Sequence, residues 1–122
     1  MGVMDSLVGI ARDVLTTTGA VVKGAELARQ WIHCKPERAQ AQWIEEIPLI
    51  VARNDRAQLS GILQEFGRQL VAAETLELQN ETNQLLSQFK ECLNTELAPL
   101  GVTLRGFLQG ATHGATRNNA VA

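Results

Sequence analysis

Residues 30–36 read QWIHCKP and residues 42–48 read QWIEEIP, so one pattern occurs twice with a spacing of 12 residues, and its two copies hold both tryptophans. This period is shorter than the ~20–50 residues of solenoid repeats, which argues against a repeat protein. Each copy places Trp a few residues before a proline, which redirects a helix. The pattern therefore predicts two corners, in which Trp31 covers the end of one helix and Trp43 anchors the next. The alternative is that exposed tryptophans anchor a partner.

Upstream of the first copy, apolar residues recur with the spacing of an amphipathic helix. At 100° per residue, seven of them fall within a sector of about 60°: Leu7, Ile10, Val14, Val21, Ala25, Ala28 and Ile32. Asp5 or Ser6 is a suitable N-cap. The pattern predicts a helix over about 6–33.

A second strip of this helix consists of small residues, Ala20, Gly24 and Ala28, and ends at Trp31. Small side chains at this spacing allow another backbone to come close. The strip therefore indicates a helix packed on two sides. The alternative is that Gly19 and Gly24 only weaken the helix, by about 1 kcal/mol each relative to Ala.

Two further helical regions follow. Pro36 suits the first turn of a helix over about 36–53, which Pro48 either kinks or divides. From Asp55, a good N-cap, helix-forming residues continue to about residue 98. The apolar face of residues 59–73 is rotated by roughly 130° from that of residues 85–100. Either the helix over 55–98 is broken near 75–83, or one long helix contacts different partners along its two halves.

The chain changes character after Pro99 and Gly101. Residues 102–108 alternate between apolar and polar, apart from Phe107, which indicates a short strand or an extended arm. Residues 110–122 repeat Gly-Ala-Thr and resemble a low-complexity tail. The expected architecture is an all-α bundle of three to four helices in a domain over 1–100, followed by an arm and tail over 101–122.

Composition excludes several classes of function. The formal net charge is −2, aromatic residues make up 4%, and there is no Tyr, which argues against nucleic acid as a partner. No stretch reaches the ~20 apolar residues that span a bilayer. Two cysteines are too few for a disulfide scaffold and indicate reduced thiols in a cytoplasmic protein.

The sequence predicts no catalytic, cofactor-binding or metal-binding site. His33 and Cys34 are adjacent, whereas Cys92 and His113 lie far along the chain, so no pair has the spacing of zinc ligands. Phosphate-binding glycine motifs are absent. Glu45 and Glu46 are expected on a solvated helix face. We therefore expect a protein that is not an enzyme and has no cofactor.

Charge is unevenly distributed along the chain. Residues 74–99 carry five Glu and one Lys, whereas residues 100–122 carry only Arg105 and Arg117. The two regions can attract one another within a chain or between chains. Together with the two-sided helix, this favours a non-catalytic interaction or adaptor protein that forms homo-oligomers, as rings or filaments, or binds another helical protein.

The interface residues expected for such an assembly come from the helix faces and the C-terminal region: Ala20, Gly24, Ala28, Trp31, Trp43, Leu85, Phe89, Leu93, Arg105, Phe107 and Arg117. A second hypothesis is a peripheral membrane protein that binds lipid through the N-terminal amphipathic helix. Basic and acidic residues are balanced on that helix, which weakens this hypothesis. A small helical enzyme or ligand-binding domain is the third.

Overall fold

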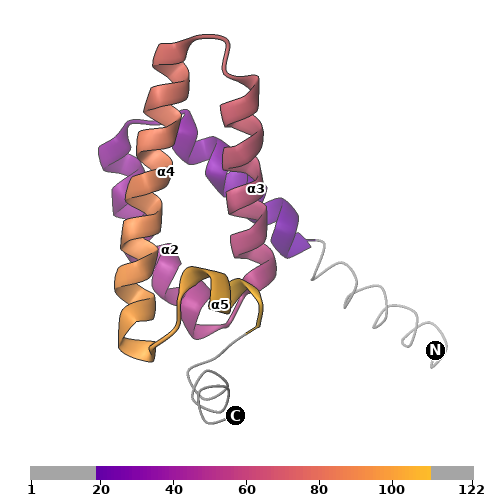
Figure 1. The fold of residues 1–122 in the computed structure, drawn as a ribbon, viewed down its shortest axis with the longest axis vertical. Coiled ribbons are helices and arrows are strands. Elements are labelled where there is room, and N and C mark those ends of the chain that lie inside the picture. The colour runs from indigo at the N-terminus through magenta and orange to yellow at the C-terminus, as the bar shows by residue number, and fades with distance from the viewer. Residues whose placement is uncertain (1–18, 111–122) are drawn as a thin grey trace, which may run out of the picture.

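The computed structural model describes residues 19–110, and within them every regular element is helical (Figure 1). A first helix over 19–32 is followed by α2 (Pro36–Ala52), α3 (Arg56–Ala72) and α4 (Leu76–Leu97). A 3₁₀ turn, η1 (Ala98–Leu100), leads to the short helix α5 (Leu104–Leu108). The all-α prediction is confirmed. Residues 6–18 of the predicted first helix lie outside the described part.

The helices form two layers. Figure 1 shows α3 and α4 as a hairpin, with the 19–32 helix and α2 behind it and α5 in front of its lower end. α4 contacts both α2 and α3, and α5 contacts α3 and α4. The hairpin is therefore covered on one side by long helices and on the other only by a short one.

The two prolines of the tryptophan copies act differently. Pro36 occupies the first turn of α2, and Lys35 before it is extended, with φ −69° and ψ 143°. Pro48 lies inside α2, which continues to Ala52. The alternative that Pro48 starts another helix is wrong. Pro48 cannot donate to the carbonyl of Ile44, but Ile44 lies on an exposed face, where water can replace the lost bond.

The region predicted over 55–98 is two helices. Asp55 accepts a hydrogen bond from the Gln58 backbone at the start of α3 (3.1 Å), and Thr75 accepts one from the Leu78 backbone at the start of α4 (3.0 Å). Residue 73 is extended, so the chain turns before the Thr75 cap. The alternative of one long helix is wrong, and the break lies at the beginning of the predicted 75–83 range.

The strand or extended arm expected over 102–108 is wrong. Thr103 caps α5 by accepting a hydrogen bond from the Gly106 backbone (2.9 Å), and Gly101 makes the preceding turn with a positive φ of 70°. Val102 and Phe107 are buried in the same core as the long helices. Phe107, which broke the alternation in the sequence, is the residue that a helix brings onto this core. Residues 111–122 lie outside the described part.

Four aromatic rings, one from each long helix, meet at the centre of the core. The ring centroid of Phe89 in α4 is 5.5 Å from those of Trp31 and Trp43 and 6.1 Å from that of Phe66 in α3. Trp31 and Trp43 pack edge to face at 6.0 Å. Such pairs add about 0.5–1.5 kcal/mol each beyond the burial of their surface. This cluster therefore joins all four helices.

The 19–32 helix crosses α3 with the two backbones in contact. A Cβ atom on Gly24 would overlap the carbonyl oxygen of Gln58 and lie 2.9 Å from the Ile62 nitrogen. A Cβ on Gly61 would overlap the carbonyl oxygen of Val21. Each helix thus supplies a glycine where the other backbone approaches. The prediction that Gly24 allows a close approach is confirmed, and the approaching backbone belongs to the same chain.

Substitution of the two crossing glycines tests this contact. We expect Gly24→Ala and Gly61→Ala each to lower the free energy of unfolding by about 1–3 kcal/mol or more, because the helices must move apart. The measurement is urea unfolding followed by circular dichroism.

Gly67→Ala in the same helix α3 is the matched control. A Cβ at Gly67 meets nothing within 4 Å, so the substitution should raise stability by about 0.5–1 kcal/mol through helix propensity. Equal effects at all three positions would contradict the proposed backbone contact.

Candidate functional site

All five aromatic residues of the chain are buried, which answers the question raised by the repeated tryptophan pattern. They are Trp31, Trp43, Phe66, Phe89 and Phe107. The Nε1 of Trp31 donates a hydrogen bond to Gln42 Oε1 at 2.7 Å across the corner between the first helix and α2. The interpretation of the tryptophans as a corner device is confirmed, and the exposed-anchor alternative is wrong.

Two buried donors have no acceptor among the described residues. They are the Nε1 of Trp43 and the Nε2 of Gln58. A buried donor without a partner costs about 1–3 kcal/mol. Trp43 thus contributes its surface to the core and no hydrogen bond, in contrast to Trp31.

The predicted interface residues divide into two groups. Eight are buried within the chain itself: Gly24, Ala28, Trp31, Trp43, Leu85, Phe89, Leu93 and Phe107. Ala20 is half-buried and Arg105 is exposed, while Arg117 lies outside the described residues. Most of the predicted set therefore packs against the chain's own helices, and these eight buried residues are not available to a partner in this fold.

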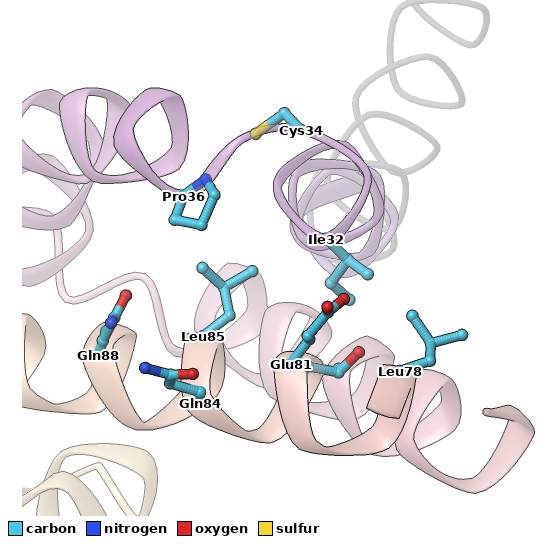
Figure 2. Close-up of a pocket in the computed structure, with 9 residues that line it drawn as sticks. Ile32, Cys34, Pro36, Leu78, Glu81, Gln84, Leu85 and Gln88 are labelled. Carbon is cyan, nitrogen blue, oxygen red and sulfur yellow. The ribbon is translucent and has the colours of Figure 1, made fainter. Parts of the chain in front are cut away.

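A pocket of about 330 Å³ lies between α4 and the corner that joins the first helix to α2. In Figure 2, Leu78 and Leu85 point from α4 toward Ile32 and Pro36 on the corner, with Glu81 between them. Its lining is Ile32, Cys34, Pro36, Leu78, Glu81, Thr82, Gln84, Leu85 and Gln88.

The groups that line this pocket offer little for catalysis. Glu81 is the one charged lining residue. The Cys34 thiol lies 3.3 Å from the carbonyl oxygen of Trp31 and donates to it. The other thiol, Cys92, is not part of this pocket. Burial raises the pKa of Cys92, and the charge of Glu96 raises it further, so Cys92 is protonated at neutral pH and a weak nucleophile.

A buried carboxylate joins the first helix to α3. Glu65 is 4% exposed. Its Oε1 lies 3.2 Å from Arg29 Nη1 and 2.9 Å from Arg68 Nη2, and its Oε2 accepts a hydrogen bond from Gln69 at 2.9 Å. Burial raises the pKa of Glu65, but the Gln69 hydrogen bond and the charges of Arg68 and Arg29 lower it more, so the pKa of this carboxyl is lowered overall. The arrangement is a clamp between helices.

Sequence analysis did not single out Glu65. In the sequence, Glu65 precedes Phe66 and follows Ile62 by three residues, which puts it beside the apolar face of α3. A carboxylate there requires partners because buried charges are otherwise costly.

The clamp predicts a pH dependence of stability. Because the pKa of Glu65 is lowered by folding, its ionised form stabilises the folded state fully above the unfolded-state pKa, and this contribution is lost as pH falls through the folded-state pKa. The difference in unfolding free energy between the wild type and Glu65→Gln should therefore shrink from about pH 6 to about pH 3. Chemical unfolding at several pH values measures it, and a difference independent of pH would contradict the clamp.

A groove lies on the side of α3 away from the first helix. Leucines from three helices, each half-buried, line most of it, and its volume is about 470 Å³. We call it the α3–α4–α5 groove, and its lining is Leu63, Gly67, Leu86, Lys90, Leu104, Arg105 and Leu108. Of these residues, the prediction included Arg105 alone. The groove was missed because the predicted arm at 102–108 gave no helix to close its lower end.

A second apolar surface surrounds the turn between α3 and α4. Val71 is 89% exposed, Leu76 71% and Leu78 44%. We call these three residues the hairpin tip. Val71 belongs to the last turn of α3, and Leu76 and Leu78 belong to the first turn of α4. The connection between these two helices is at the upper end of the hairpin in Figure 1. None of the three was among the predicted interface residues, because Val71 lies off the apolar face of residues 59–73 and the other two precede the apolar face assigned to residues 85–100.

Neither metals nor membrane spans are indicated for the described residues. Within residues 19–110, no group of three or more His, Cys, Asp or Glu side chains is placed to hold a metal ion. In the same part of the chain, no helix combines the length and the hydropathy needed to cross a bilayer. Comparison with known proteins finds no matching family, no matching curated protein and no matching solved structure. A function for this chain is therefore inferred from its own surfaces.

Proposed function

We propose that this chain is a non-catalytic helical assembly protein that forms homo-oligomers. Its contacts would use apolar surfaces that stay exposed after the core of the single chain has formed. The observation that carries the proposal is the hairpin tip, where Val71 and Leu76 are largely exposed although the aromatic core is complete without them. Single exposed apolar residues are ordinary, but neighbouring ones around one turn are typical of interaction sites.

Association would remove this surface from water. Burial of apolar surface contributes about 25 cal/mol per Å², and only the excess over the entropic cost of association stabilises a complex. The α3–α4–α5 groove supplies a second apolar surface on the same hairpin. Two separate surfaces allow one chain to contact two neighbours, as rings and filaments require.

The non-catalytic part of the proposal is supported by the pocket of Figure 2. Glu81 lacks a second ionisable carboxylate or histidine in the lining with which to share acid–base work. We also place the protein in the cytoplasm, because Cys34 and Cys92 are free thiols, as is usual in a reducing compartment.

Light scattering after size-exclusion chromatography tests the proposal. The full-length protein should show a mass well above 13.3 kDa that rises with concentration. A mass of one chain at every concentration would overturn homo-oligomerisation. Co-sedimentation of that monomer with vesicles would then favour the peripheral membrane hypothesis.

The hairpin tip can be tested separately with a double variant, Val71→Gln and Leu76→Gln. Because both side chains are exposed, the fold should be retained while the mass at a given concentration falls. Ile44→Gln is the control, since Ile44 is 72% exposed on α2 and lies outside the hairpin tip. Equal masses for the tip variant and the control would show that the tip makes no contact between chains.

A further inference from the structure

We propose that residues 5–15 of a second copy of this chain dock in the α3–α4–α5 groove as an amphipathic helix. This inference rests on the proposed homo-oligomerisation and names the segment and the surface that make one of its contacts.

The groove has the chemistry of a site for an apolar helix face. Leu63 and Leu86 come from facing positions on α3 and α4, and Leu104 from α5. A Cβ at Gly67 would meet nothing within 4 Å, so the surface above this residue is open to another chain. Grooves of this kind bind helices that present apolar residues at i, i+3 and i+7.

The N-terminal segment has this pattern. Leu7, Ile10 and Val14 are spaced i, i+3 and i+7 and share one face in the sequence-based helix over 6–33. These residues lie outside the described part of the chain. No proline occurs before Pro36, so the pattern of the first helix is not interrupted between this segment and residue 19.

Charge favours this segment over the C-terminal one. The charged residues that line the groove, Lys90 and Arg105, are both basic. Asp13 lies about 90° round the helix from the centre of the apolar face, at its boundary, whereas Arg12 lies opposite that face. Residues 111–122 carry Arg117 and no acidic side chain, so they match neither the charge nor the leucines of the groove.

The position of the groove favours a second copy over the same chain. Leu63 lies about 200° round α3 from Gly61, where the first helix crosses. Figure 1 accordingly shows the first helix behind α3 and α5 in front. If residues 5–18 continue the first helix as the sequence pattern predicts, they would extend it by about 20 Å at 1.5 Å per residue, and a straight helix would not return to the front of its own α3. It can reach the groove of a neighbour.

Disulfide trapping between two differently substituted chains tests the contact. Both chains carry Cys34→Ser and Cys92→Ser, so that each has one thiol. One chain then carries Ala11→Cys at the edge of the apolar face, and the other carries Gly67→Cys in the groove. The control partner carries Ile44→Cys on exposed α2. A size tag on one chain identifies the mixed dimer, and circular dichroism confirms that each variant is helical.

We expect the Ala11→Cys chain to form a mixed disulfide with the Gly67→Cys chain at least about tenfold faster than with the Ile44→Cys chain, because docking raises the effective concentration of the thiols. Equal rates with an oligomer still present by light scattering would overturn the docking and leave the proposed function standing. If both variant chains were monomeric, the docking and the proposed homo-oligomerisation would both be overturned.

A single chain that carries both Ala11→Cys and Gly67→Cys distinguishes docking of the segment in the groove of a second copy from docking in its own groove. Docking between chains predicts that its disulfide joins different molecules and that the disulfide forms more slowly when the protein is diluted before oxidation. A disulfide that forms within one molecule, independently of concentration, would show that the segment covers its own groove and would overturn the second-copy assignment.

Discussion

The contact on which the rest of the structure depends is the crossing of the first helix and α3, where Gly24 and Gly61 let the backbones touch. Side chains elsewhere adapt to one another, but at this point nothing lies between the helices. The ion pair from Arg29 to Glu65 then ties the same two helices further along. Because these two helices are held together, Trp31 at the end of the first helix is fixed in place, and its ring packs against that of Phe89.

The aromatic cluster connects the two crossing helices to α2 and α4. Trp31, Trp43, Phe66 and Phe89 come from four different helices, and all are buried. A chain with so few aromatic residues has none on the described surface, so the rigid aromatic anchors common in interfaces are absent there. The proposed contacts between chains therefore use aliphatic surface, part of which lies at the hairpin tip and in the α3–α4–α5 groove.

The sequence predicted most of the helices because their signals are local. Pro36 marked the start of α2, and Asp55 marked the start of α3. The rotated apolar faces indicated a break before residue 85, although the cap at Thr75 was needed to locate it. The strand expected at 102–108 was wrong because alternation over so few residues does not distinguish a strand from a capped helix.

The surfaces were harder to predict than the elements. Apolar residues on a helix face do not reveal whether the chain or a partner covers them, which is why Leu85 and Leu93 were taken for an interface and lie in the core. The groove depends on three helices meeting, and Leu63, Leu86 and Leu104 become neighbours only in the folded chain. The contact of Gly24 with another backbone was foreseen, whereas its partner Gly61 was not, because the sequence does not say which helices cross.

The most direct test of this account is hydrogen exchange in the native state, measured residue by residue. If the crossing organises the fold, the backbone amides of residues 24–28 and 61–66 should exchange only through global unfolding, with the highest opening free energies in the chain. Amides of α5 should exchange through smaller openings. Exchange at the crossing with an opening free energy well below that of global unfolding, while the amides around Phe89 stay protected, would contradict the central place given to this contact.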